Sequence, residues 1–186
     1  MLKYWKPDLS VTFAEFPTDV TLCVNISQCP GMCAECSEKY LQEDIGDYLT
    51  NEVIDELIKT HPGITVFGLM GGDNDQDDVV RVAEHIHKNY PGLKVGMYSG
   101  REYLSTKLLN CLDLYKIGRW IPPHGPIEEW HKSNWGPLPF PYSNQLLFEK
   151  MHNSDGEVWM NTTYKFRKEK INNPEKYIIR PEDNKD

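Results

Sequence analysis

Residues 20–26 (VTLCVNI) run through Ser27 and Gln28 into residues 29–36 (CPGMCAEC), and these segments decide the expected fold and chemistry. The first segment is short and mostly apolar, as is typical of a buried strand in a parallel sheet. The second contains three of the five cysteines, with the spacing C-x3-C-x2-C. The cysteine loop therefore follows a strand end, and open α/β sheets and barrels bind their ligands at that edge.

The cysteine spacing indicates an iron–sulfur cluster. Closely spaced thiolates bind such clusters, normally with four thiolates per [4Fe-4S] cubane. Three thiolates, those of Cys29, Cys33 and Cys36, would leave one iron without a protein ligand. An open position of this kind lets a metal centre bind and activate a small molecule. Pro30 and Gly31 suit a loop around a compact inorganic core, because Gly permits positive φ and Pro fixes its own φ.

A zinc-binding adaptor without catalytic activity is the alternative interpretation of the three thiols. Structural zinc normally has four protein ligands, often arranged as two pairs of closely spaced cysteines. No second CxxC pair occurs in the sequence, and the nearest downstream histidine is His61. These ligand rules favour the cluster over zinc.

Composition and charge exclude several classes of function. The 186 residues are 39% hydrophobic and 26% charged, which fits one globular domain. The net charge of −8 gives no basic field for nucleic acid or an anionic membrane surface. No run of 18 apolar residues and no signal-peptide core are visible. We therefore expect a cytoplasmic protein that binds neither nucleic acid nor membrane, and an odd, clustered set of cysteines fits that reducing compartment.

Strands and helices are expected to alternate along most of the chain. The expected strands are residues 10–16, 20–26, 64–70, 93–98 and 112–118, and the expected helices begin at Thr50, Gln76 and Arg101. This alternation indicates βαβ units with right-handed crossovers and a parallel sheet. A complete eightfold barrel takes about 250 residues. The sequence therefore predicts an α/β fold that forms a partial, open (β/α) barrel with mostly parallel strands.

The later part of the chain changes in composition. We expect a core domain over residues 1–165 and a polar, loosely ordered C-terminal tail over residues 166–186. Two short strands are expected near residues 145–149 and 158–160. Residues 119–142 are rich in proline and tryptophan, and would form either a docking surface or a lid.

At Cys29, Cys33 and Cys36 the sequence resembles the radical S-adenosylmethionine (SAM) superfamily, whose signature is this C-x3-C-x2-C loop. The resemblance implies a [4Fe-4S] cluster on these cysteines, with SAM bound to the fourth iron, and a partial barrel of radical SAM type. It also implies that one-electron reduction splits SAM into methionine and a 5′-deoxyadenosyl radical.

Within that superfamily the chain is most similar to the activating protein of the anaerobic (class III) ribonucleotide reductase. Six segments carry the similarity, which covers roughly residues 10–150: residues 20–30, Gly71-Gly72-Asp73, Tyr98-Ser99-Gly100, residues 113–118, Gly136-Pro137-Leu138 and Ser143-Asn144-Gln145. The similarity implies that the reductase receives a glycyl radical and that a flavodoxin-type protein donates the electron. Activation of another glycyl-radical enzyme and small-molecule ring formation are the alternatives within the superfamily.

Five residues at expected strand ends are candidates for binding SAM. Gly71 and Gly72 would let the backbone approach the ligand, and Asp73 would add charge assistance at the SAM ammonium. Ser99 would bind the ribose or the methionine carboxylate, and Lys116 would pair with that carboxylate. The alternatives are helix caps at Asp73 and Ser99 and a solvent-directed Lys116.

The residue that stacks on adenine is not evident from the motif. Glu35 stands where many members of the superfamily have an aromatic residue, although the activating proteins often lack it. Tyr40 is the candidate for this role.

Overall fold

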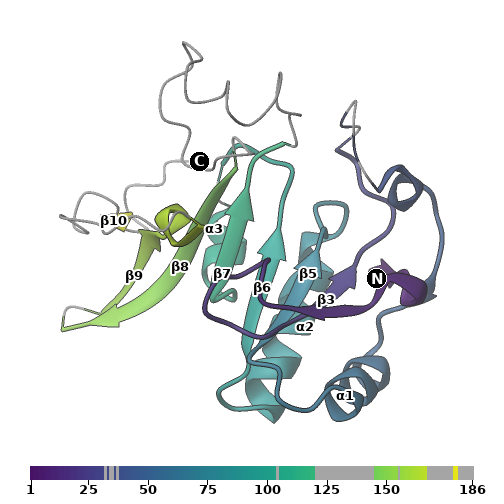
Figure 1. Cartoon of the computed structure of the whole chain (residues 1–186), viewed down its shortest axis with the longest axis horizontal. Helices are drawn as coiled ribbons and strands as arrows, with labels where there is room; N and C mark the ends of the chain where they lie inside the picture. Colours follow the sequence, from purple (N-terminus) through teal and green to yellow (C-terminus); the bar gives the residue numbers. More distant parts are fainter. Residues whose placement is uncertain are drawn as a thin grey trace.

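The computed structural model describes residues 1–31, 33, 36, 38–103, 105–119, 145–154, 156–166 and 178–179 (Figure 1). Its main sheet contains β2 (Ser10–Thr12), β3 (Thr21–Asn25), β5 (Val66–Met70), β6 (Lys94–Tyr98), β7 (Leu114–Ile117), β8 (Leu146–Asn153), β9 (Gly156–Asn161) and β10 (Ile178–Ile179). The strand order is β10-β9-β8-β7-β6-β5-β3-β2. A small second sheet pairs β1 (Lys3–Tyr4) with β4 (Asp47–Tyr48).

The main sheet is mixed with a parallel centre, which confirms the α/β class. β3, β5, β6 and β7 are parallel neighbours, whereas β2, β8, β9 and β10 pair antiparallel. Only two residues separate β8 from β9, which is too few for the crossover that a parallel pair requires. The described ranges form an open sheet and no closed barrel.

Helices α1 (Asn51–Thr60) and α2 (Gln76–Asn89) confirm two of the expected helices. The Thr50 side chain caps α1 by accepting a hydrogen bond from the backbone N–H of Val53, and Asp75 caps α2 in the same way. The helix expected from Arg101 shortens to α3 (Thr106–Leu109), and Tyr103, within the expected helix, is 54% exposed. Three 3-10 helices also occur among the described residues: η1 (Lys6–Asp8), η2 (Lys39–Gln42) and η3 (Thr163–Phe166).

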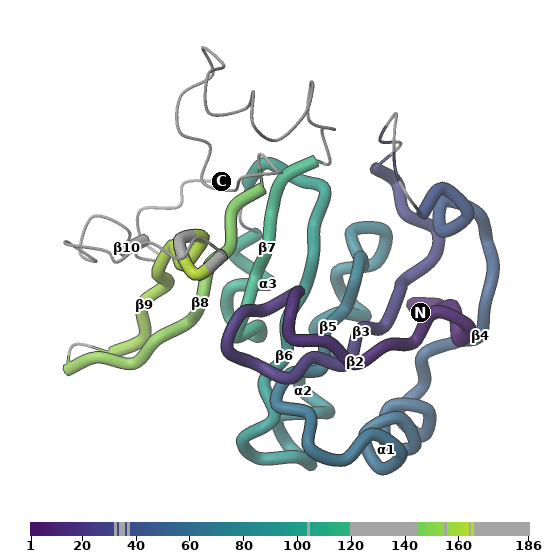
Figure 2. The backbone as a smooth tube through the Cα atoms, viewed as in Figure 1, coloured from purple at the N-terminus to yellow at the C-terminus, as the bar shows by residue number. Residues whose placement is uncertain are grey.

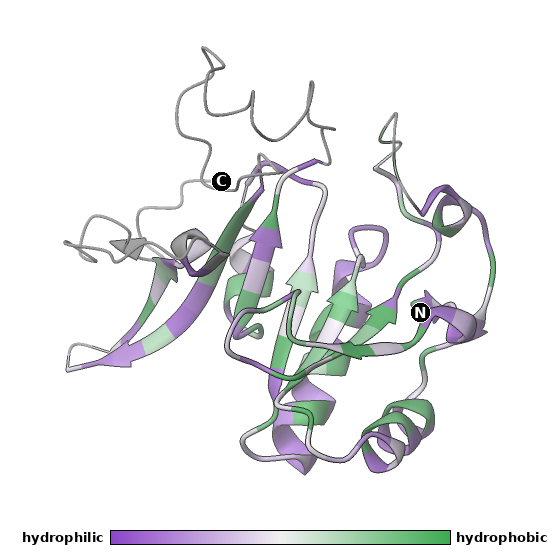
Figure 3. Cartoon of the chain, in the orientation of Figure 1, coloured by the Kyte–Doolittle hydropathy of each residue, from purple (hydrophilic) through white to green (hydrophobic). Residues whose placement is uncertain are grey.

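Two hydrophobic clusters cover the two faces of the central strands. The larger cluster joins alternate residues of these strands to α1, α2 and α3, and the smaller one consists of Phe16, Val66, Leu114 and Leu147. Because both faces are covered, nearly every residue of β3, β5, β6 and β7 is buried. Figure 3 shows the hydrophobic residues concentrated in β3, β5 and β6.

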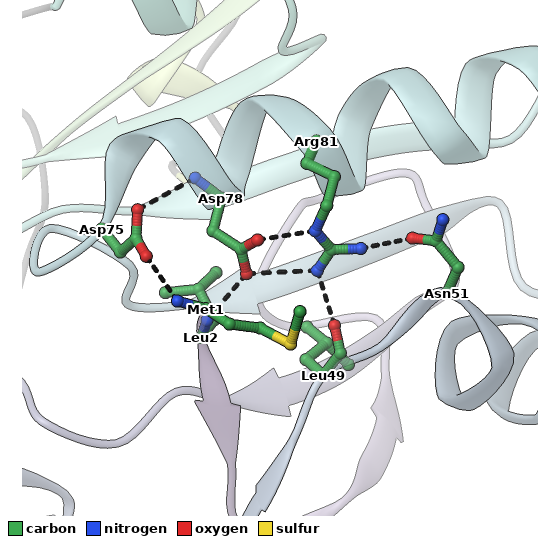
Figure 4. A network of polar contacts seen from close by, with 7 residues as sticks. All are labelled: Met1, Leu2, Leu49, Asn51, Asp75, Asp78 and Arg81. Carbon is green, nitrogen blue, oxygen red and sulfur yellow. Dashed lines mark hydrogen bonds and ion pairs between the residues drawn. The ribbon is translucent and has the colours of Figure 1, made fainter.

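A polar network on α2 fixes the first residues of the chain and the entry to α1 (Figure 4). The Asp78 carboxylate accepts hydrogen bonds from the backbone N–H of Leu2 at 2.7 Å and from Arg81 Nε at 2.6 Å. The Arg81 guanidinium also donates to the Leu49 carbonyl at 2.6 Å and to the Asn51 side chain. Asp78 is thereby paired with a cation, as a buried carboxylate requires.

The expected C-terminal tail is described only in part. Ile178–Ile179 form β10 against Met160 and Trp159, whereas residues 167–177 and 180–186 lie outside the described part of the chain. Most of the proline- and tryptophan-rich segment, residues 120–144, also lies outside it. In the described ranges, no helix has both the length and the apolar composition needed to cross a membrane.

Candidate metal centre

The carboxyl ends of three parallel strands meet at one edge of the sheet (Figure 1). β3 leads through Ile26 to the cysteine loop, β5 leads to Gly71 and Gly72, and β6 leads to Ser99. The structure therefore places the predicted cysteines and most of the other predicted site residues at the same edge, as the sequence indicated.

Backbone hydrogen bonds hold the base of the cysteine loop. Ser27 N–H donates to the Lys3 carbonyl at 3.0 Å, Gln28 N–H to the Glu43 carbonyl at 3.1 Å, and Cys29 N–H to the Leu41 carbonyl at 2.9 Å. Gln28 has a φ of 60°, so the chain turns sharply just before the first cysteine. The loop is thus anchored on two other segments of the protein.

The sulfurs of Cys29 and Cys33 both lie beside Gly31. A Cβ at Gly31 would lie 3.4 Å from Cys29 Sγ and 3.7 Å from Cys33 Sγ, so the absent side chain leaves room beside both sulfurs. Cys36 N–H donates to the Cys33 carbonyl at 3.2 Å, and all three thiols are free and half-buried. Gly31 therefore suits its expected place in a loop around an inorganic core.

The electrostatic surroundings of these thiols also favour binding of a cationic group. Burial raises the pKa of the Cys29 thiol, and the nearby Asp73, Cys33 and Cys36 raise it further. Thiolates crowded together in this way need positive charge for stability, and iron ions supply it. Within the described ranges, no three His, Cys, Asp or Glu side chains converge as ligands of a single ion would. A cubane has no such requirement, because each thiolate binds a different iron.

Gly71 and Gly72 have a steric reason to be glycine. Their φ values are +123° and +122°, a region that L side chains rarely adopt. A Cβ at Gly72 would lie 2.8 Å from Val79 Cγ2, and a Cβ at Gly71 would lie 3.3 Å from Ile26 Cβ. These two glycines let the end of β5 pass close to α2 and to the residue that leads into the cysteine loop.

Asp73 and Ser99 contact each other directly. The Asp73 carboxylate accepts from Ser99 Oγ at 2.8 Å and from Gly100 N–H at 2.8 Å, and both side chains are buried. Asp75, not Asp73, caps the following helix. Arg101 Nε lies 3.4 Å from Asp73 Oδ1, and the guanidinium also donates to the Asp73 carbonyl at 3.2 Å. Sequence reasoning missed Arg101, although it directly follows the Tyr98-Ser99-Gly100 segment.

Lys116 lies on the inner face of the sheet, the face opposite the helices, and is 8% exposed. Its Nζ is 3.8 Å from the centroid of the Tyr98 ring, so the side chain does not turn to solvent. Burial lowers the pKa of Lys116 to about 8, an effect that the charge of Glu15 partly offsets.

Tyr40, the candidate for adenine stacking, and the residues that carry the family similarity have other contacts or fall outside the described part of the chain. The Tyr40 hydroxyl donates to the Asp8 carboxylate, and its ring lies 6.4 Å from that of Trp5 between centroids. Gln145 donates to the Gly118 carbonyl at 2.8 Å. Glu35 and Asn144 are outside the described residues.

Comparison with known proteins bears on the cluster. A family model described as a 4Fe-4S single cluster domain matches residues 19–126, which are 108 of the 186 residues. Neither the comparison with curated proteins nor that with solved structures gave a match. The matched range contains the whole cysteine loop and the ends of β5, β6 and β7. The chain therefore belongs to the family of 4Fe-4S single cluster domains.

Proposed function

We propose that this chain is a radical SAM activase, with the partial barrel of that superfamily. It cleaves SAM reductively at its cluster and removes a Cα hydrogen from a glycine of an anaerobic ribonucleotide reductase in the cytoplasm. One observation carries the proposal: the C-x3-C-x2-C loop lies at the same sheet edge as the ends of β5 and β6. Membership of a 4Fe-4S family supports the cluster, and the segment similarities support the choice of partner.

In this proposal Cys29, Cys33 and Cys36 hold the cluster and leave one iron for SAM. When bound, the cluster supplies one electron to SAM, whose C5′–S bond breaks. In balance, one electron, SAM and a glycine residue give methionine, 5′-deoxyadenosine and a glycyl radical. A flavodoxin-type protein would donate the electron.

The chain's own residues would bind and orient SAM at the sheet edge. Asp73 holds the ends of β5 and β6 together through Ser99 and Gly100, which keeps the Gly71-Gly72 backbone beside the cysteine loop. That backbone would accept hydrogen bonds from the SAM ammonium, and Asp73 would add negative charge. Arg101 brings positive charge to the same edge, suitable for the SAM carboxylate. Lys116 would attract an anionic group from the inner face.

Cluster loading tests the first step of the proposal. Cys33→Ala should lose iron, sulfide and SAM cleavage after anaerobic reconstitution, whereas Cys111→Ala should keep all three, because Cys111 is buried away from the loop. The measurements are iron and sulfide content, visible absorbance, and methionine released from SAM. Stoichiometric zinc in the purified wild type, or SAM cleavage that persists in Cys33→Ala, would contradict the proposal.

Electron paramagnetic resonance tests the identity of the partner. The loaded protein, SAM, a reductant and the purified anaerobic reductase should give the signal of a glycyl radical. If SAM is cleaved but no radical forms on the reductase, the chain activates another glycyl-radical enzyme or acts on a small molecule.

A further inference from the structure

Residues 13–19, here called the strap, join β2 to β3 and cross the inner face of the sheet (Figure 2). Phe16, in the middle of the strap, is completely buried against Val66, Leu114 and Leu147. Ligands of α/β folds bind at the carboxyl ends of the strands, next to this inner face. The strap therefore borders the space that the proposed reaction would use.

Strand register divides the inner face into two rows. The upper row, next to the strand ends, is Asn25, Met70, Tyr98, Lys116 and Leu147. The lower row, two residues earlier on each parallel strand, is Cys23, Gly68, Gly96, Leu114 and Glu149. Both rows point to the same face because strand side chains alternate, and the rows are roughly 7 Å apart.

The two rows differ in exposure. Every residue of the lower row is buried, whereas Asn25, Met70 and Tyr98 of the upper row stay partly exposed. Only the upper row of the inner face is therefore accessible to solvent. A group that approaches from the strand ends can contact the upper row, but the lower row is covered.

Two glycines of the lower row make room for this arrangement. A Cβ at Gly96 would lie 2.6 Å from two ring carbons of Phe16, so only glycine accommodates the ring there. A Cβ at Gly68 would lie 2.7 Å from both Met70 Cε and Thr21 Cγ2. The Phe16 ring then meets the Tyr98 ring edge-on, with 5.3 Å between centroids and an interplanar angle of 76°.

Polar contacts anchor the strap near both ends. Tyr98 donates its hydroxyl hydrogen to the Glu15 carbonyl at 2.7 Å, and that hydroxyl also contacts the Glu15 carboxylate. At the other end, the Asp19 carboxylate is 3.0 Å from Lys94 Nζ and accepts from Thr65 Oγ1 at 2.8 Å. Phe16 is therefore fixed in place on the sheet.

We infer that Phe16 is a specificity-determining residue that restricts a substrate to the upper row of the inner face. The inference rests on the proposed function and adds the residue that sets how far a substrate can enter. Because the Phe16 ring covers the lower row, a substrate side chain cannot reach it, and the C–H group must be presented at the strand ends. A glycine on a loop of a partner protein meets this requirement, whereas a small molecule held deep inside the sheet does not.

The test compares two versions of the partner reductase, one with its target glycine and one with alanine there. Wild type and Phe13→Ala should prefer glycine about tenfold or more, the discrimination that one extra carbon commonly gives. Phe13 is the matched control because it lies on the strap and is 71% exposed. In Phe16→Ala the preference should fall about tenfold, measured as radical yield by electron paramagnetic resonance. An unchanged ratio, including an equal loss with both partners, would overturn the inference.

Indole binding to the cluster-free protein provides a readout that does not depend on the reaction. Phe16→Ala should bind indole in the space left by the ring, whereas wild type and Phe13→Ala should not. A folded Phe16→Ala protein that binds no indole would overturn the inference. If Phe16→Ala does not fold, the ratio of radical yields with the glycine and alanine partners, measured for Phe16→Leu, carries the test. If wild type gives no radical with the glycine partner, the proposed function fails, and indole binding still shows whether Phe16 fills the inner face.

Discussion

Gly72→Ala should destabilise the protein far more than an ordinary glycine substitution does. The new Cβ would stand in a backbone conformation with a φ of +122°, which costs about 1–3 kcal/mol for a residue other than glycine. It would also lie 2.8 Å from Val79 Cγ2 and 3.3 Å from Met97 Cε, and overpacking of this kind costs about 1–3 kcal/mol. The sum, about 2–6 kcal/mol, is a large part of the 5–15 kcal/mol typical of a folded domain.

Gly92→Ala is the matched control for this prediction. Gly92 has a φ of +92°, but no atom lies within 4 Å of a Cβ placed there, so its cost is backbone strain alone. Urea unfolding of the cluster-free protein, followed by circular dichroism under reducing, anaerobic conditions, gives both free energies of unfolding. The difference between the variants should be about 1–3 kcal/mol, the packing contribution. Equal losses would show that the end of β5 does not pack against α2 and β6 as described.

Three further substitutions test other parts of the structure. Burial lowers the pKa of Lys116 from 10.5 to about 8 in the folded protein. Between these two pH values the unfolded chain therefore binds more protons than the folded chain does. Wild type should therefore gain up to about 3 kcal/mol of stability relative to Lys116→Met as pH rises from 8 to 10.5, and parallel pH profiles would contradict this. Asp73→Asn should cost about 1–3 kcal/mol of stability, because it weakens the hydrogen bonds to Ser99 and Gly100. It should also speed iodoacetamide alkylation of the Cys29 thiol at neutral pH, because Asp73 raises the pKa of that thiol. Asp77→Asn, at an exposed position, should change neither measurement. Thr50→Ala should cost about 1 kcal/mol in urea unfolding, since it removes the cap of α1, and an unchanged midpoint would refute that role.

Local sequence signals predicted the elements that local interactions form. The apolar run before Cys29 is β3, and Thr50 caps the start of α1, close to where the pattern predicted a helix. α3 is shorter than expected because the Arg101 carbonyl, which the first turn of that helix would use, accepts a hydrogen bond from Gly118 N–H at 2.7 Å. No helical periodicity could reveal that tie.

The strap is the clearest case of a feature that sequence could not show. Alternation predicted one strand over residues 10–16, but β2 ends at Thr12 and the chain then crosses the sheet. The cause lies in Gly96, about eighty positions further along, whose missing side chain admits the ring of Phe16. Likewise, the thiols of the metal centre were evident from spacing alone, whereas Arg101 becomes a candidate only once its contact with Asp73 is known.

The backbone bonds at the base of the cysteine loop have a consequence for substitutions elsewhere in the chain. Ser27 is held by Lys3, and Gln28 and Cys29 are held by Glu43 and Leu41. The first thiol is therefore positioned by two segments that carry no cysteine of their own. A change that displaces either segment would shift that thiol relative to the sheet edge without touching the C-x3-C-x2-C spacing.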